Sequence, residues 1–224
     1  MAHDYFAVVA NTFSTAAHWP NGFDESKLQQ WAQDLHGQLG AAPVSLGLVF
    51  ITPQLFPHAQ QILEILRVHA RIPLLAGCSS QGLIAGGQEF EDKACLTLGL
   101  YSLPGATLKA MHFTQEQVEE ANGAAYWHLQ TGIEPKQTNG WLVFIDPFHL
   151  DSEAWLRGWN EAYAPLPILG GLASGESNEQ LTQVYLNGDA FEEGGVAISV
   201  GGALVLWGAL TGNLPANILS TIHA

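Results

Sequence analysis

An internal repetition limits the folds open to this chain more than any other feature of its sequence. The segment Leu48-Val49-Phe50-Ile51-Thr52-Pro53 returns 94 positions later as Leu142-Val143-Phe144-Ile145-Asp146-Pro147. The same spacing joins further pairs: Ala70 and Ala164, Pro73 and Pro167, Leu75 and Leu169, Gly77 and Gly171, and Ser80 and Ser174. A repeat decides the architecture before any single element does, because each copy forms the same supersecondary unit. We predict copies over about residues 44–103 and 138–201.

Each copy is predicted to open as strand, helix, strand and turn. An apolar run over residues 46–51 or 141–145 ends at a proline, which is typical of a buried strand that stops where no ladder hydrogen bond can be donated. The helices that follow place Ala59, Ile62, Leu63 and Leu66 inward in the first copy, and Trp155, Leu156 and Trp159 inward behind an Asp151 cap in the second. Short strands over residues 72–76 and 166–169 lead into glycine-serine turns.

Further strands are predicted after each turn, so that each copy finishes as a β-meander. Their ranges are 83–85, 94–101, 182–186 and 195–200, with Asn187-Gly188 as a hairpin turn. The remaining predicted elements are a strand over residues 5–10, a helix around Leu28, Trp31 and Leu35, and a helix begun by a capping box of Thr114 and Gln117. The predicted fold class is α/β (α+β): two duplicated strand-helix-strand-meander halves with mixed sheets and flanking helices, in one domain over residues 1–224.

Charge and hydropathy exclude several kinds of partner. The 7 Lys+Arg against 21 Asp+Glu give a net charge of −14, and this field repels phosphate backbones and anionic lipid headgroups. The apolar run over residues 196–210 is shorter than the ~20 residues of a membrane-spanning helix and is interrupted at Gly201-Gly202, so we predict two buried strands there. The N-terminal residues do not form a signal peptide. We expect a cytoplasmic protein that binds neither nucleic acid nor membrane.

The spacing of cysteine and histidine supports neither a metal site nor a disulfide. Cys78 and Cys95 stand 17 positions apart in unlike contexts, and no two of the nine histidines lie within a helical turn of each other. A phosphate-binding loop also fails, because Leu83 and Ile84 stand where that motif requires Lys and Ser or Thr. We therefore predict no metal and no cofactor.

The two glycine-serine turns carry the strongest binding signal. Glycines permit close backbone approach, and free amides and hydroxyls supply hydrogen-bond donors. Both turns follow a strand, where open α/β sheets tend to bind ligands. The predicted ligand-binding residues are Gly77, Cys78, Ser79, Ser80 and Gly82 in the first copy, Gly170, Gly171 and Ser174 in the second, and Asp146 at the end of a strand. We infer a shared site for a small polar metabolite; the alternative is tight turns whose serines bond their own backbone.

Two other functions stay open. Cys78 or a loop serine could serve a hydrolase or transferase, although the residue 94 positions after Cys78 is Leu172, which indicates an inward apolar place. A scaffold or oligomerisation domain without a ligand is the second, since seven tryptophans could supply aromatic contact area. His149 is interpreted as a partly exposed loop residue and Asp151 as a helix cap, so only Asp146 of this stretch is placed at the site.

The order of the motifs resembles the FIST family of sensory domains. The run Leu48–Ile51 with a downstream Gly-Cys-Ser-Ser-x-Gly, followed by Gly-Gly-Leu-Ala-Ser-Gly and Val-Tyr-Leu-Asn-Gly, is similar to the N-terminal part of FIST domains over residues 44–210. The resemblance implies a non-catalytic signal-input module that binds a small ligand, with amino acids among the candidates. It also implies a signalling-output protein or a C-terminal FIST domain as partner.

Overall fold

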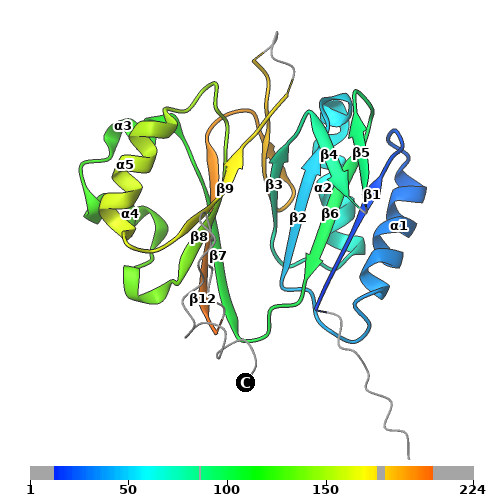
Figure 1. Cartoon of the computed structure of the whole chain (residues 1–224), viewed down its shortest axis with the longest axis horizontal. Coiled ribbons are helices and arrows are strands. Elements are labelled where there is room, and N and C mark those ends of the chain that lie inside the picture. The colour runs from blue at the N-terminus through cyan, green and yellow to red at the C-terminus, as the bar shows by residue number, and fades with distance from the viewer. Residues whose placement is uncertain (1–12, 86, 176–179, 204–224) are drawn as a thin grey trace, which may run out of the picture.

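The chain forms a mixed α/β structure with three sheets and five α-helices in the residues that are described (Figure 1). The computed structural model describes residues 13–85, 87–175 and 180–203. The strand predicted over residues 5–10, and the part of the 196–210 run beyond residue 203, lie outside them. Among the helices in these ranges, none is long and apolar enough to cross a membrane.

Two large sheets and one small sheet contain the strands. The six-stranded sheet has the order β1 (Ser14–Trp19), β6 (Leu96–Tyr101), β2 (Leu46–Ile51), β3 (Leu75–Ser79), β10 (Val184–Leu186) and β11 (Asp189–Phe191). The four-stranded sheet has the order β7 (Ala106–Phe113), β12 (Gly195–Gly202), β8 (Gly140–Ile145) and β9 (Ile168–Leu172). The pair β4 (Gly82–Ala85) and β5 (Gln88–Glu91) forms the small sheet.

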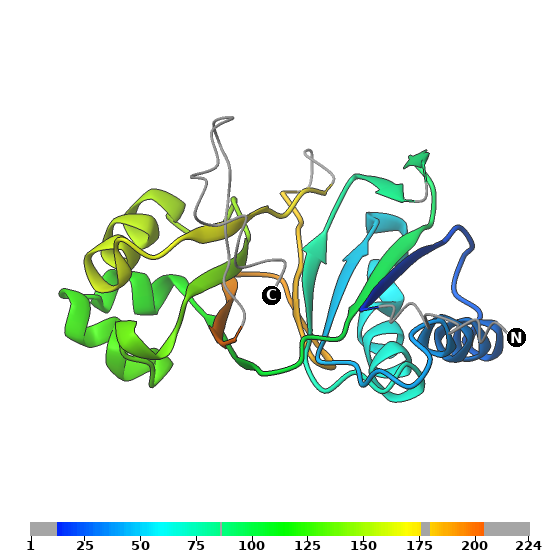
Figure 2. The same cartoon turned by 60° about the horizontal axis from the view of Figure 1, so that its bottom comes forward.

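Helices cover the outer faces of the two large sheets, which pack against each other through their inner faces (Figures 1 and 2). Beside the six-stranded sheet lie α1 (Glu25–Gly37) and α2 (Ala59–His69), and beside the four-stranded sheet lie α3 (Gln115–Glu120), α4 (Ala124–Thr131) and α5 (Ser152–Tyr163). Short 3₁₀ turns occupy Pro53–His58 and Pro135–Gln137. The inner layer is apolar, with the Phe50 and Phe144 rings edge to face at 5.7 Å. The order of layers is helix, sheet, sheet, helix.

Local sequence signals placed most of these elements correctly. The β2 strand occupies the predicted range, and α2 buries its predicted apolar face. The capping box of Thr114 and Gln117 begins α3, and the Asp151 carboxylate accepts the Ala154 N–H at 2.8 Å to cap α5. The inward prediction for Leu156 is wrong, since this side chain is 43% exposed beside the free edge of the four-stranded sheet.

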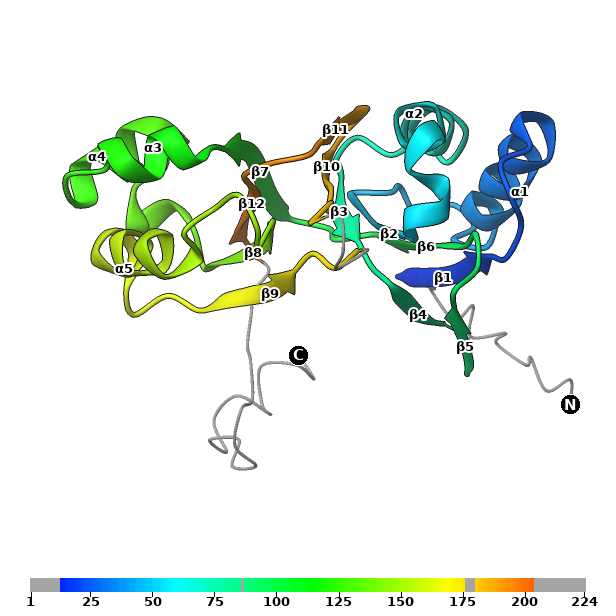
Figure 3. The ribbon, with the colours of Figure 1, turned by 90° about the horizontal axis from the view of Figure 1, so that it is seen from above.

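The prediction that each half ends as a meander is wrong. The β6 strand pairs with β1 and β2, while β5 pairs only with β4 among the described strands. In the second half, the β10–β11 hairpin leaves the sheet of β8 and β9 and pairs antiparallel with β3 (Figure 3). Val184 and Tyr185 point to opposite faces of β10. Tyr185 is buried in the core beneath the helices, and Val184 is buried in the inner layer between the two sheets. The second half therefore contributes a hairpin to the sheet of the first half, which no local signal reports.

The second parallel strand of each half also starts and ends later than predicted. The glycine-serine segments are mostly strand, because Gly77, Cys78 and Ser79 lie within β3 and Gly170 and Gly171 within β9. Only the residues after Ser79 and Leu172 form loops. The predicted cradling loops are therefore shorter than the motifs that suggested them.

Strand register gives a spacing of 93 between β3 and β9, one residue less than the sequence repeat. Val49 pairs with Gly77, and Val143, 94 positions later, pairs with Gly170. A Cβ atom at Gly77 would overlap the Val49 carbonyl oxygen, and one at Gly170 would overlap that of Val143. Gly77 thus corresponds to Gly170 and not to Gly171, and both positions require glycine because the neighbouring strand approaches so closely.

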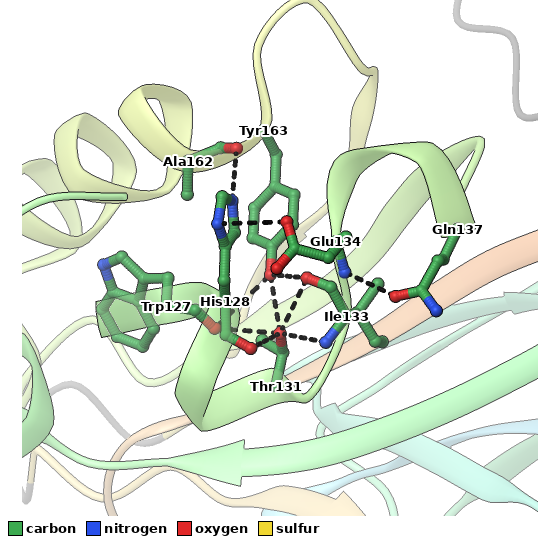
Figure 4. A network of polar contacts seen from close by, with 8 residues as sticks. All are labelled: Trp127, His128, Thr131, Ile133, Glu134, Gln137, Ala162 and Tyr163. Carbon is green, nitrogen blue, oxygen red and sulfur yellow. Dashed lines mark hydrogen bonds and ion pairs between the residues drawn. The ribbon is translucent and has the colours of Figure 1, made fainter. Parts of the chain in front are cut away.

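A partly buried polar network joins α4 to α5 in the helix layer beside the four-stranded sheet (Figure 4). The hydroxyls of Thr131 and Tyr163 lie 2.6 Å apart, and the Tyr163 hydroxyl donates to the Ile133 carbonyl at 3.1 Å. Burial is the main reason that the pKa of Tyr163 is raised. The network satisfies the carbonyl groups at the end of α4 where the chain turns away.

The Tyr163→Phe substitution is expected to destabilise the protein by about 1–2 kcal/mol, because it leaves the Ile133 carbonyl without this donor. Urea unfolding followed by tryptophan fluorescence measures the change. The matched control is Tyr126→Phe, whose exposed hydroxyl donates to Glu120 at 3.2 Å, and it should change the unfolding free energy by less than about 0.5 kcal/mol. Equal losses in both variants would contradict a structural role for the network.

Candidate functional site

The two glycine-serine loops meet at one end of the sheets. The Ser174 N–H donates to the Ser79 carbonyl at 3.1 Å, and the Gln81 N–H donates to the Ser174 hydroxyl at 3.0 Å. The predicted closeness of the loops therefore holds for these residues. Ser80 behaves differently, because its hydroxyl donates to the Gly82 carbonyl of its own loop at 2.6 Å.

The serines at positions 80 and 174 do not occupy corresponding places. The Ser80 N–H donates to the Ile51 carbonyl at 3.0 Å, and in the other half the Ala173 N–H donates to the Ile145 carbonyl at 2.8 Å. Ser80 thus corresponds to Ala173, so the pairing of Ser80 with Ser174 drawn from the 94-residue spacing is wrong.

Asp146 is a buried carboxylate with several donors around it. Its oxygens accept the Phe148 N–H at 2.9 Å, the His149 N–H at 3.1 Å and the Thr182 hydroxyl at 2.8 Å. The side chain is fully buried at the end of β8, where the predicted ligand group was placed. It holds the loop after β8 against the segment that leads into β10.

The Asp146 carboxylate also orients the imidazole of His149. The distance from His149 Nδ1 to Asp146 Oδ2 is 2.8 Å, while the His149 side chain is 47% exposed. A carboxylate accepts hydrogen bonds, so Nδ1 carries the hydrogen and Nε2 is the ring nitrogen left over. That Nε2 has no hydrogen-bond partner among the described residues.

His149 lines a pocket of about 660 Å³ beside the loop junction, a volume within the range of small-molecule sites. The other lining residues are His112, Gln180, Leu181, Ala190, Phe191, Glu192 and Glu193. The His112 ring stacks on Phe191 at 3.8 Å, and its Nε2 donates to the Glu193 carbonyl at 2.9 Å. Two oriented imidazoles and two carboxylates therefore surround one cavity.

The pocket connects to the first loop through a short chain of hydrogen bonds. Thr182 contacts Asp146, and the next residue, Gln183, donates its N–H to the Ser79 hydroxyl at 3.0 Å. The Ser79 N–H in turn donates to the Gln183 carbonyl at 2.8 Å. Ser79 is buried, so its predicted contact with a ligand is replaced by a contact that fixes the entry into β10.

The other predicted site residues lie away from this pocket. Gly77 lies inside the six-stranded sheet, and Gly82 lines a separate hollow with Gln81, Glu91 and Asp92. Gly170 and Gly171 are exposed in β9, along a groove on the α5 side. Of the nine predicted residues, the structure brings together Ser79, Ser80 and Ser174 at the loop junction and Asp146 beside it.

Cys78 has the surroundings of a buried apolar side chain. It packs in the inner layer with Phe144 and Val184, and burial raises the pKa of its thiol to about 12. The 94-residue spacing makes Leu172 the counterpart of Cys78, and this alignment is wrong. Cys78 pairs with Phe50, and the residue that pairs with Phe144, the counterpart of Phe50, is Gly171. Leu172 is 57% exposed. A high thiol pKa is the opposite of what nucleophilic cysteines have.

Alkylation by iodoacetamide at pH 8 is expected to be slow at Cys78 in the folded protein, since both burial and the raised thiol pKa oppose reaction. Mass spectrometry after timed quenching gives the rate, and the same reaction in denaturant should label Cys78 and Cys95 readily. A Leu129→Cys variant, placed where the side chain is 79% exposed, provides an accessible thiol for comparison. Labelling of Cys78 as fast as this introduced thiol would overturn the assignment and revive the thiol-enzyme hypothesis.

Sequence reasoning missed several of the residues that line the pocket. His112 lies on β7, whereas Phe191, Glu192 and Glu193 are consecutive residues at the end of β11 and just after it, and no sequence signal links them to His112. His149 offered one usable signal, because it stands three positions after Asp146, within reach of a side-chain hydrogen bond. Of this pair, only Asp146 was predicted to be a site residue.

Comparison with known proteins identifies relatives of part of this chain. The chain is 27% identical over 173 residues to two proteins from two strains of Mycobacterium tuberculosis, each named only as an uncharacterized protein. The matched region covers 76% of this chain and 42% of each relative, so the chain spans less than half of their length. The model of the FIST N domain matches residues 45–217. The chain therefore belongs to the FIST N domain family.

Proposed function

We propose that this FIST N domain binds a small polar metabolite in the pocket of His112 and His149, and that binding serves as sensory input without catalysis. The observation that carries the proposal is the orientation of His149 by the buried Asp146 carboxylate. Such a fixed and partly exposed imidazole supplies a hydrogen-bonding group whose direction does not change when a ligand arrives. Fixed polar groups around a cavity are what small-molecule sites use to orient a ligand.

The chemistry of the pocket favours a ligand that donates hydrogen bonds. The Nε2 atom of neutral His149 is an acceptor, and Glu192 and Glu193 add exposed carboxylates. A protonated amine fits these acceptors, while the amide of Gln180 offers donors for a carboxylate. Amino acids and small amines therefore form the proposed ligand class.

The glycine-serine loops form a supporting wall in this proposal and not the contact surface itself. Ser174 bonds to the backbone of the first loop at Ser79 and Gln81, and Ser79 fixes the segment that presents Thr182 to Asp146. A ligand that alters the His149 loop would thus act on hydrogen bonds that cross between the two halves. These hydrogen bonds support the transmission of a binding signal, because coupling between sites is carried by contiguous hydrogen-bond networks.

We further propose that the two halves descend from one duplicated unit and that the domain works in the cytoplasm beside a signalling output protein or a C-terminal FIST domain. The matched roles of Gly77 and Gly170 support the duplication, since each accepts the close approach of a valine carbonyl. The length of the relatives leaves room for a further domain in those proteins.

A thermal-shift screen against amino acids and small amines tests the proposal, because a ligand that binds only the folded state raises its stability by RT ln(1 + [L]/Kd). A hit should lose most of its shift in His149→Gln and keep it in His69→Gln, a histidine on α2 that lies outside this pocket. A Ser80→Ala, Ser174→Ala double variant should keep most of the shift. If the double variant loses the shift and His149→Gln keeps it, the site belongs at the loops instead.

A further inference from the structure

Among the described strands, β9 lies at an edge of its sheet and has no strand on its outer side. It lies at one end of the four-stranded sheet, with β8 on its inner side (Figure 3). The Pro167 carbonyl and the Ala173 N–H bond to β8, at 2.9 Å to Trp141 and 2.8 Å to Ile145. Because strand residues alternate, the backbone groups of Ile168, Gly170 and Leu172 point away from β8. Within the described residues these groups have no hydrogen-bond partner.

The other half of the molecule shows what covers the matching edge. The outer edge of β3 is paired antiparallel by β10, with Gly77 opposite Tyr185. The Ser79 N–H donates to Gln183 at 2.8 Å, and the Leu75 carbonyl accepts from Asn187 at 2.7 Å. Gly170 occupies the same place in β9 as Gly77 does in β3. The outer edge of β9 therefore has the same backbone geometry as the edge of β3 that pairs with an antiparallel strand.

The residues of β9 include neither the charged side chains nor the proline that commonly prevent an edge strand from pairing with another strand. The sequence Ile168-Leu169-Gly170-Gly171-Leu172 has no charge and no proline, and Leu172 is 57% exposed. Together with Leu156 of α5 it lines a groove of about 290 Å³, in which Glu153 is the one charged side chain among the described lining residues. An exposed apolar edge of this kind is typical of a surface that pairs with another strand.

We propose that this edge is an interface between two copies of the chain, paired antiparallel through β9 about a twofold axis at Gly170. A twofold axis makes two identical edges antiparallel, which is the orientation that β10 adopts on β3. Ile168 of one copy then lies opposite Leu172 of the other, so the cross-strand pairs are apolar. Gly170 at the centre leaves room for the chains to approach, and the two sheets become one continuous sheet.

The net charge makes the pairing dependent on salt. Each copy carries −14, so the two copies repel each other at long range, while the strands that meet are uncharged. Added salt screens the repulsion and leaves the apolar pairs and backbone bonds in place. Dimerisation should therefore strengthen as NaCl is raised, which is the reverse of an interface built on ion pairs.

Sedimentation equilibrium over a concentration series tests the proposal, with Leu172→Lys as the disrupting variant. A charge at the edge should raise the dimer dissociation constant by at least about tenfold. The matched control is Leu129→Lys on α4, which starts from a 79% exposed leucine and should leave dimerisation unchanged. Because both sites are exposed, we expect lysine to leave the fold intact, and circular dichroism of each variant checks this.

Hydrogen exchange gives a second measurement that is independent of mutation. The amides of Ile168, Gly170 and Leu172 should become protected as protein concentration rises, and amides of the exposed β4–β5 hairpin should not. A chain that stays monomeric at every concentration and salt level overturns the proposal. So does a dimer that Leu172→Lys leaves intact, or one whose concentration-dependent protection lies away from β9.

Discussion

Replacement of Gly77 by alanine is expected to destabilise the protein by about 3 kcal/mol or more, because the new methyl group overlaps the Val49 carbonyl oxygen. The strand cannot move aside to relieve this overlap, since β3 lies between β2 and β10 and is hydrogen-bonded to both. Denaturant unfolding measured by circular dichroism gives the loss, and a failure to accumulate folded protein would be its extreme form.

Gly82→Ala is the matched control for this effect. An added methyl group there meets its nearest atoms at 3.6 Å, an ordinary contact, so the unfolding free energy should change by less than about 1 kcal/mol. A Gly77→Ala protein as stable as Gly82→Ala would show that β2 and β3 are not paired in the register described.

Asp146→Asn is expected to destabilise the protein by about 2–4 kcal/mol and to free the His149 ring. The amide keeps the size of the carboxylate but turns an NH₂ group toward donors, so it cannot accept both His149 hydrogen bonds and the Thr182 hydroxyl. Unpaired donors buried by the substitution account for the loss of stability. Urea unfolding measures the stability, and ring nitrogen NMR shifts of His149 report its release.

The control for Asp146 is Asp151→Asn, at the cap of α5. Asparagine caps helices about as well as aspartate, so this exposed exchange should cost only a few tenths of a kcal/mol. A similar small change at Asp146 would mean that its carboxylate does not organise the pocket.

The sequence predicted elements where local physics determines them. Apolar runs that end at Pro53 and Pro147 indicated β2 and β8, and the caps at Thr114 and Asp151 marked the start of α3 and α5. Each of these signals is contained within a few consecutive residues. These predictions were therefore independent of how distant parts of the chain pack.

The pairing of strands across the halves could not be predicted in the same way. The β10 strand pairs with β3 more than 100 residues earlier, and its apolar residues Val184 and Tyr185 fit either sheet. From β2 to β8 the two halves are 94 residues apart, and from β3 to β9 they are 93 residues apart. A sequence repeat that is aligned at one constant spacing cannot detect this difference. Identical residues such as Ser80 and Ser174 therefore aligned although their backbones occupy different places.

The candidate site shows the same division. Asp146 was predicted because it ends a strand, and the serine loops because their composition is unusual. The pocket itself combines His112 of β7 with His149 after β8 and with residues 190–193, whose position follows from the placement of the β10–β11 hairpin beside β3. Long-range packing thus decides where ligand-binding groups converge, while local motifs mark the loops that support them.

NMR mapping of backbone amides during titration with a thermal-shift hit tests the central claim most directly. Saturable shifts should cluster at residues 112, 149, 180–181 and 190–193, around the imidazole that Asp146 orients. A larger groove of about 760 Å³ lies elsewhere, between α2 and the turn of the β10–β11 hairpin. Shifts confined to that groove, or to β9, would contradict a binding site at His149.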